Sequence, residues 1–288
     1  MNCPDYNSPT ALKTILDENS MAMQKKFGQN FLVNENARKK IVDSLSISDG
    51  IRVWEIGPGL GAMTSELLSR GAVVTAFEID RGFARLLRRF FCDEIADGKL
   101  KIVEGDAMKT IKKELLLNEI PDRFFGNLPY NIASQIIGGT IEVGVRFEKL
   151  VVTVQKEVAE RMASRAGEKE YSSFSVLCQW AYNVRTVADL AGGSFWPVPN
   201  VASRTVLLEP TNDFPNCKNS EFFRKMVRTL FSSRRKTVRN NLLSISSAQI
   251  VDDSLLACGI SPSSSVETLD VKTLLSLSDS LFSKKTGE

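Results

Sequence analysis

Apolar residues change their spacing several times along the chain, and these changes outline the expected elements. An apolar position every three or four residues predicts a helix over Asn34–Leu45. After Asp49-Gly50, short apolar runs alternate with helical stretches. The expected strands are Arg52–Ile56, Val73–Ile79, Leu100–Val103, Arg123–Phe125 and Leu150–Val154. This alternation predicts an α/β fold with a doubly wound, mostly parallel sheet and helices on both of its faces.

The last part of the chain has a different pattern. Two strand-like runs, Val184–Leu190 and Ser203–Leu208, flank a loop rich in proline and glycine, which predicts an antiparallel hairpin at the edge of the sheet. Pro210–Lys218 has the composition of a linker, and only helical patterns follow it. The expected organisation is an N-terminal extension outside the core over residues 1–24, an α/β domain over 25–210 and a small all-helical domain over 211–288.

Composition narrows the chemistry and the compartment. The 288 residues include no histidine, so the commonest general base and the commonest zinc ligand are both absent. The five cysteines lie far apart in the sequence, which predicts free thiols and no bound metal. No apolar run approaches the roughly 18 residues of a membrane helix, and the first residues lack the pattern of a targeting peptide. We expect a cytoplasmic protein.

A glycine-rich turn, Glu55–Gly61, follows the first expected strand and precedes a helical stretch. Glycines permit a tight turn and a close approach of the backbone to a ligand. Glu78 ends the second strand, about 20 positions after Gly57, where a carboxylate can accept hydrogen bonds from both hydroxyls of a ribose. Asp106 ends the third strand, where its carboxylate can accept a hydrogen bond from the amine of an adenine. The sequence therefore predicts a nucleoside-containing cofactor at this edge of the sheet.

The turn alone leaves two other interpretations open. Gly57, Gly59 and Ala62 satisfy the G-x-G-x-x-G/A pattern of nicotinamide dinucleotide enzymes. A glycine turn can also connect a strand to a helix without binding a ligand. The acidic residues disfavour this last interpretation.

The segment Gly126–Asn131, after the fourth strand, indicates the reaction. It contains an amide, a proline and an aromatic residue in an order that a nicotinamide enzyme does not need. The exocyclic amine of adenine is a poor nucleophile because its lone pair is delocalised into the ring. The side-chain oxygen of Asn127 and a backbone carbonyl at Leu128 or Pro129 can accept its hydrogens and localise that lone pair. Tyr130 can stack on an extruded base, although a half-buried tyrosine in a simple turn would have the same sequence.

Seven motifs in the same order resemble the small-subunit (16S-type) ribosomal RNA adenine dimethyltransferase family, the KsgA type. The resemblance extends from Lys25 to the end of the chain. It implies a Rossmann-like class I methyltransferase domain followed by a helical domain. The motifs are Lys26–Leu32, Glu55–Gly61, Glu78–Asp80, Gly105–Ala107, Asn127–Tyr130, Gly193–Pro199 and Phe231–Lys236.

The resemblance also implies roles for individual residues and a substrate. Members of the family transfer two methyl groups from S-adenosylmethionine to each of two adjacent adenosines near the 3′ end of the small-subunit RNA, which leaves S-adenosylhomocysteine. Asn127 would border both the cofactor and the target amine, and Phe195 would sandwich the target base opposite Tyr130. The implied cofactor-binding residues are Asn30, Leu32, Gly57, Glu78, Asp106 and Asn127.

A basic stretch near the C-terminus predicts contact with RNA. No acidic residue occurs between Phe222 and Val251, whereas the net charge of the whole chain is only +3. A helix face with such uncompensated charge attracts phosphate, with an affinity that falls steeply with salt. The cations are Arg224, Lys225, Arg228, Arg234, Arg235, Lys236 and Arg239, of which the last four are the predicted RNA-binding residues. Lys25 and Lys26 could extend this surface.

Two further functions remain open from the sequence. The chain could be a ribosome-assembly or transcription factor that kept the fold and lost catalysis, although its intact acidic and amide residues argue against this. It could also be a large-subunit RNA methyltransferase of the antibiotic-resistance type, which shares the catalytic motifs. We expect a monomer that acts on an immature small ribosomal subunit.

Overall fold

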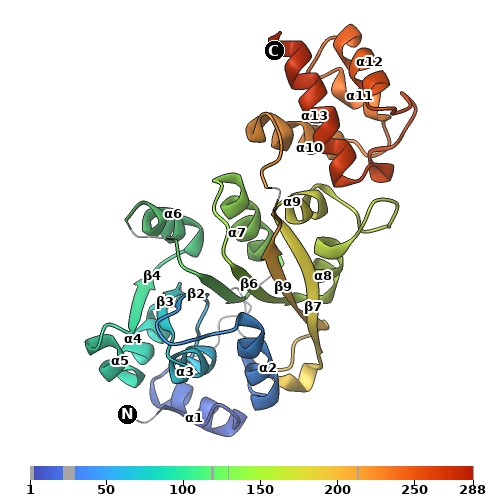
Figure 1. The fold of residues 1–288 in the computed structure, drawn as a ribbon. Coiled ribbons are helices and arrows are strands. Elements are labelled where there is room, and N and C mark those ends of the chain that lie inside the picture. Colours follow the sequence, from blue (N-terminus) through green and yellow to red (C-terminus); the bar gives the residue numbers. More distant parts are fainter. Residues whose placement is uncertain (1–2, 22–29, 118–119, 129, 213, 288) are drawn as a thin grey trace. The chain divides into compact units, whose positions relative to one another are not determined.

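The computed structural model describes residues 3–21, 30–117, 120–128, 130–212 and 214–287, and the chain forms two compact units (Figure 1). The first unit contains Met1–Ile136, Phe147–Ala159 and Arg185–Glu209. The second contains Ile137–Arg146, Glu160–Val184 and Pro210–Glu288, so each unit is assembled from separate segments of the chain. The continuous domain ranges 1–24, 25–210 and 211–288 stay a prediction.

A seven-stranded, mostly parallel sheet forms the centre of the fold, as the strand and helix pattern predicts. Its order is β4-β3-β2-β5-β6-β9-β7. The first five strands in this order pair in parallel, and β9 pairs antiparallel with β6. The strands are β2 (Arg52–Ile56), β3 (Val73–Glu78), β4 (Leu100–Glu104), β5 (Arg123–Asn127), β6 (Lys149–Gln155), β7 (Tyr182–Leu190) and β9 (Ser203–Pro210). A separate two-stranded sheet pairs β1 (Phe31–Leu32) with β8 (Phe195–Trp196).

Helices connect the strands, and side-chain caps define where several of them begin. The side chain of Asn34 accepts a hydrogen bond from the N–H of Ala37 at the start of α2, which confirms the predicted helix there. The carboxylate of Asp80 caps α4 in the same way, immediately after β3. The helices up to the middle of the chain are α1 (Pro9–Glu18), α2 (Glu35–Leu45), α3 (Ala62–Ser69), α4 (Arg81–Phe90), α5 (Cys92–Ala96), α6 (Ala107–Leu117), α7 (Tyr130–Glu142), α8 (Lys156–Ala163) and α9 (Ser173–Ala181).

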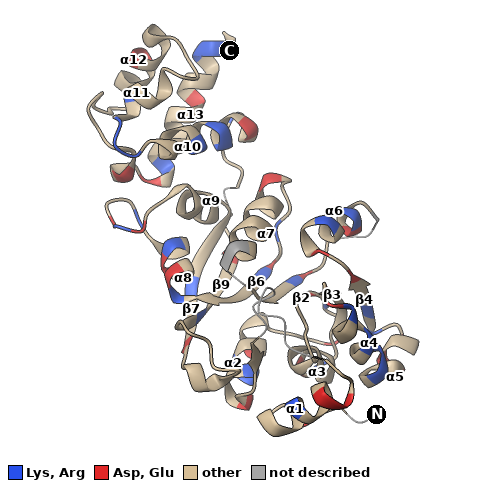
Figure 2. Ribbon diagram, turned by 180° about the vertical axis from the view of Figure 1, so that it is seen from behind, with Lys and Arg blue, Asp and Glu red and all other residues tan. Residues whose placement is uncertain are grey.

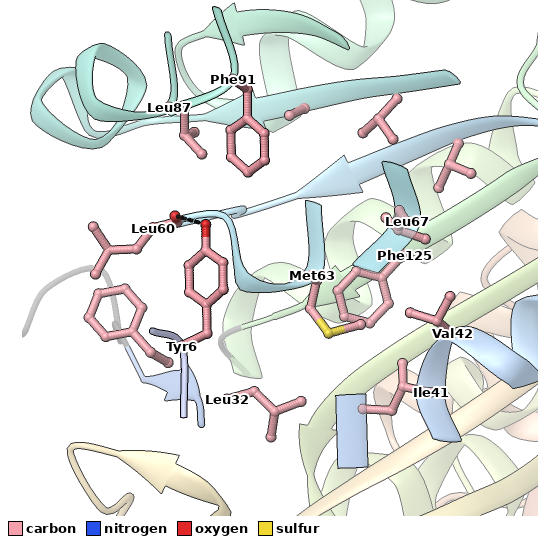
Figure 3. Close-up of a cluster of buried hydrophobic side chains, with 14 of the residues drawn as sticks. Tyr6, Leu32, Ile41, Val42, Leu60, Met63, Leu67, Leu87, Phe91 and Phe125 are labelled. Carbon is pink, nitrogen blue, oxygen red and sulfur yellow. Dashed lines mark hydrogen bonds between the residues drawn. The ribbon is translucent and has the colours of Figure 1, made fainter. Parts of the chain in front are cut away.

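The N-terminal extension belongs to the core of the first unit, and the prediction that excluded it from the core is wrong. The side chains of Tyr6, Leu12 and Leu16 are only 8%, 1% and 4% exposed. They join a buried cluster that includes Leu60 of the glycine-rich turn (Figure 3). A short helix with two buried leucines gives too weak a periodic signal to be distinguished from a peripheral helix.

Helices dominate the second unit. They are α10 (Ser220–Ser232), α11 (Val238–Leu242), α12 (Ala248–Ala257) and α13 (Val271–Thr286), with a short 3-10 turn, η3, at Val266–Thr268. Two aromatic residues from the middle of the chain pack among them: the Tyr171 ring contacts Phe231, and the Trp180 ring contacts Phe223. The Tyr171 hydroxyl also donates to the carbonyl of Leu269 at 2.9 Å.

Candidate cofactor and active site

A pocket lies at the carboxyl ends of β2, β3, β4 and β5, where open α/β sheets bind ligands. All the residues predicted from the sequence to bind the cofactor line this one pocket. They are Asn30, Leu32, Gly57, Glu78, Asp106 and Asn127. The parallel register explains the convergence, because it places Ile56 beside Phe77 and Gly126 and thus brings the ends of the strands to the same height. Their binding roles stay a prediction.

The glycine-rich turn requires glycine at more than one position. Gly57, Gly59 and Gly61 all have positive φ, at 71°, 58° and 92°. A Cβ at Gly59 would lie 2.9 Å from the Phe31 ring, and one at Gly61 would lie 2.5 Å from the Phe91 ring. The turn therefore packs too closely against its neighbours to accept side chains.

Glu78 is held in place before any ligand binds. Its carboxylate is 4% exposed and accepts the backbone N–H groups of Gly59 at 3.1 Å and Asp80 at 2.8 Å. Burial raises the pKa of this carboxyl to about 7, although the two backbone hydrogen bonds oppose the shift. A buried acceptor of this kind suits a neutral, hydroxyl-bearing ligand.

Glu55 is a pocket residue that sequence reasoning did not assign to the site. It lines the pocket, is 1% exposed and accepts the Thr64 hydroxyl at 2.7 Å. Burial and, to a smaller extent, the nearby charge of Glu78 raise its pKa to about 8, although the hydrogen bond from Thr64 opposes the shift. The available signal was an acidic residue among the apolar residues Val53, Trp54 and Ile56, directly before the glycines of the turn.

The Glu55→Gln variant is expected to change how the free energy of unfolding depends on pH. Because the pKa is raised in the folded state, the wild-type protein loses stability as pH rises from about 4.5 to about 8. Glutamine cannot ionise, so the variant should lack this loss and be more stable than wild type at pH 8, by an amount on the order of a few kcal/mol. Urea unfolding at pH 5 and pH 8 measures this, and parallel pH profiles for the two proteins would contradict it.

Asn127 ends β5 with its amide oriented by the backbone. Its Nδ2 donates to the carbonyl of Asn30 at 3.0 Å, so Oδ1 is the atom left to accept a hydrogen from a substrate. The next residue, Leu128, also lines the pocket, and its N–H donates to the backbone carbonyl of Thr153 at 2.9 Å. Pro129 lies outside the described residues. Tyr130 begins α7, but its side chain is likewise outside the description.

Phe195 lies away from the pocket surface. It pairs with Leu32 across the β1–β8 sheet, is 3% exposed and is not among the residues that line the pocket. Its stacking on a target base stays a prediction, which would require this ring to become accessible.

The basic stretch is partly neutralised, so the prediction of an uncompensated face is wrong in part. Arg228 pairs with Glu142, Arg234 pairs with Glu267, and Arg239 pairs with Asp252. All three acidic partners lie outside residues 222–251, so a charge count restricted to that stretch does not include them. Arg235 and Lys236 are exposed and have no ion pair among the described residues; Figure 2 shows further basic positions along α10.

Within the described part of the chain, no three histidine, cysteine, aspartate or glutamate side chains gather as a metal site would require. In the same residues, no helix is both long enough and apolar enough to cross a membrane.

The doubly wound sheet, the glycine-rich turn and the pocket across the strand ends define a Rossmann-like class I methyltransferase. The family model described as ribosomal RNA adenine dimethylase matches residues 21–282, and the chain belongs to that family.

Comparisons with individual proteins agree with this assignment. The chain is 45% identical to the ribosomal RNA small subunit methyltransferase A of Treponema denticola, over 96% of this chain and 95% of the relative. Among solved structures, a dimethyladenosine transferase from Plasmodium falciparum aligns with a TM-score of 0.74 and 26% identity, over 88% of this chain and 97% of that one. The 23S rRNA methyltransferase ErmE aligns with a TM-score of 0.64 over 87% of this chain and 99% of that one, and at 24% identity it shows a shared fold.

Proposed function

We propose that this protein is an rRNA adenine dimethyltransferase that uses S-adenosylmethionine to methylate two adjacent adenosines near the 3′ end of the small-subunit RNA. The relative from Treponema denticola is named for the small subunit, which supports that substrate over the large subunit. The observation that carries the proposal is the oriented amide of Asn127 in the same pocket as Glu78 and Asp106. A protein that had lost catalysis would not need to keep this amide in place.

The pocket fits S-adenosylmethionine. Glu78 supplies a fixed carboxylate for the ribose hydroxyls, and Asp106 lies at the next strand end for the adenine amine. Gly57 and Gly59 of the glycine-rich turn also line the pocket, so the backbone there can approach the remainder of the cofactor closely. Asn30 and Leu32 form the wall beside Asn127.

The chain's own residues prepare the amine for attack. When bound, the cofactor supplies an electrophilic methyl group on a sulfonium. The Oδ1 atom of Asn127 and a backbone carbonyl at Leu128 or Pro129 would accept hydrogens from the adenine amine, which would make the nitrogen more tetrahedral and its lone pair available. The methyl group would pass from the sulfonium to the amine nitrogen, and the proton released by the amine would leave to solvent. This step needs positioning and hydrogen-bond acceptors but neither histidine nor metal.

The RNA partner would be bound in part by Arg234, Arg235, Lys236 and Arg239 in the second unit. Because Arg234 and Arg239 already pair with carboxylates, we expect the unpaired cations to contribute more to phosphate binding. We infer a monomer that acts in the cytoplasm on an immature small subunit.

Replacing both Arg235 and Lys236 with glutamine should weaken RNA binding and lower the salt slope of the binding constant by about two. Fluorescence anisotropy with a small-subunit RNA fragment at several salt concentrations measures the slope. The matched variant Arg234→Gln/Arg239→Gln removes two paired cations and should have a smaller effect. Equal slopes for wild type and Arg235→Gln/Lys236→Gln would contradict an RNA role for the unpaired cations.

The proposed function is tested with radiolabelled S-adenosylmethionine and small subunits that lack the modification. Nucleoside analysis should find dimethyladenosine at two adjacent positions near the 3′ end. Label in large-subunit RNA alone would favour the other ribosomal substrate. Cofactor binding without any label in RNA would favour the assembly factor.

A further inference from the structure

The N-terminal segment contacts the glycine-rich turn directly. Tyr6 is buried, and its hydroxyl donates to the carbonyl of Leu60 at 3.1 Å (Figure 3). Leu60 lies between two of the turn's glycines, and the N–H of the preceding Gly59 donates to Glu78. Tyr6 itself is not among the residues that line the pocket. It therefore holds the backbone that orients the predicted ribose acceptor without touching the ligand.

The neighbouring residue, Asn7, contacts a second wall of the pocket through an arginine. The guanidinium of Arg38 is 3% exposed and donates to Asn7 Oδ1 at 2.6 Å. The same guanidinium donates to the carbonyl of Leu32 at 2.9 Å, and Leu32 lines the pocket beside Asn30. Arg38 also pairs with Glu66 at 3.9 Å, and because each buried N–H needs an acceptor, Asn7 helps to keep the guanidinium on the Leu32 carbonyl.

Other described residues of the segment, up to Met21, are also anchored. Leu12 and Leu16 of α1 are buried in the core cluster. Met21 packs against the start of α4, where its Cε lies 2.6 Å from the position that a Cβ on Gly82 would take. The N–H of that Gly82 is bound by Asp80, which in turn donates its own N–H to Glu78. These contacts bury the segment in the core, whereas the bonds to the turn and to Arg38 come from Tyr6 and Asn7.

We propose that Tyr6 and Asn7 are positioning residues for the cofactor pocket, holding the glycine-rich turn and the β1 wall in the geometry that binds S-adenosylmethionine. The inference rests on the proposed cofactor, and it gives the N-terminal extension a role in the reaction. Loss of either contact weakens cofactor binding and raises KM for S-adenosylmethionine, while kcat at saturating cofactor and KM for RNA stay near wild type.

The test compares four variants with wild type by calorimetric titration of S-adenosylmethionine, at a temperature where each is folded. Tyr6→Phe removes only the hydroxyl. Asn7→Ala removes one acceptor of Arg38 together with an exposed hydrogen bond from Asn7 to Glu35. Each should weaken binding about three- to tenfold. Lys13→Ala changes an exposed position on the same segment and should bind as wild type. Leu12→Ala creates a cavity in the same buried cluster, so it should lower the Tm without weakening the binding of the cofactor.

The outcomes separate the proposals. Wild-type affinity in both Tyr6→Phe and Asn7→Ala overturns the positioning role. Equal losses of affinity in Leu12→Ala and Tyr6→Phe also overturn it, because the segment would then act through general stability. If the wild-type protein itself does not bind S-adenosylmethionine, the proposed function fails, and this inference fails with it.

Discussion

Replacing Asn127 with alanine is expected to lower kcat for methyl transfer by about 100-fold to 1,000-fold, while cofactor affinity changes little. The reason is that Oδ1 is aimed by the bond from Nδ2 to Asn30 and accepts a hydrogen from the amine as the nitrogen becomes tetrahedral. Removing one such preorganised hydrogen-bonding group commonly costs two to three orders of magnitude, as for oxyanion-hole donors. Single-turnover methylation of small subunits measures the rate, and calorimetry measures the affinity.

Two companion variants sharpen this prediction. Asn127→Asp keeps an acceptor but loses the donor to Asn30, so its rate should lie between those of wild type and Asn127→Ala. Asn36→Ala removes an exposed asparagine of α2 and should be indistinguishable from wild type. Near wild-type rates in Asn127→Ala would remove the amide from the mechanism.

The Glu78→Ala variant is expected to bind S-adenosylmethionine roughly 100-fold more weakly than wild type. Two hydrogen bonds from the ribose hydroxyls would be lost, and at about 1–1.5 kcal/mol each they account for a loss of this size. The folded protein should tolerate the change, since burial already disfavours ionisation of this carboxyl and raises its pKa to about 7. Calorimetry for binding and urea unfolding for stability are the two measurements.

A matched control for Glu78 is its register partner on the next strand. Glu104 pairs with Glu78 across β3 and β4, but it is exposed, bound to Arg88 and outside the pocket. Glu104→Ala should therefore leave cofactor affinity unchanged. Unchanged affinity in Glu78→Ala would show that the ribose is held by other groups.

The arrangement of the cofactor pocket was predictable because it depends on strand periodicity and chain direction. Each predicted strand ends within two residues of the observed one, and parallel strands bring their carboxyl ends together wherever the helices lie. Gly57, Glu78 and Asp106 each follow or end such a strand, so their convergence follows from the pattern alone.

The features that the sequence did not predict depend on partners distant in the chain. The burial of Tyr6 requires Leu60, and the neutralisation of Arg228 requires Glu142. A local window contains only one member of each pair. Glu55 was missed for another reason: an acidic residue in a strand has many structural explanations, and only the pocket distinguishes them.

The interleaved second unit constrains how it can be separated from the rest of the molecule. A fragment cut at Pro210 would keep α10 to α13 but lose Tyr171 and Trp180, whose rings cover Phe231 and Phe223. In such a fragment Phe231 and Phe223 would lose these contacts, and apolar surface that is buried in the full chain would be exposed to solvent. The second unit is thus not a detachable module: an autonomous version would have to retain residues 160–184, which include the first residues of β7 in the seven-stranded sheet.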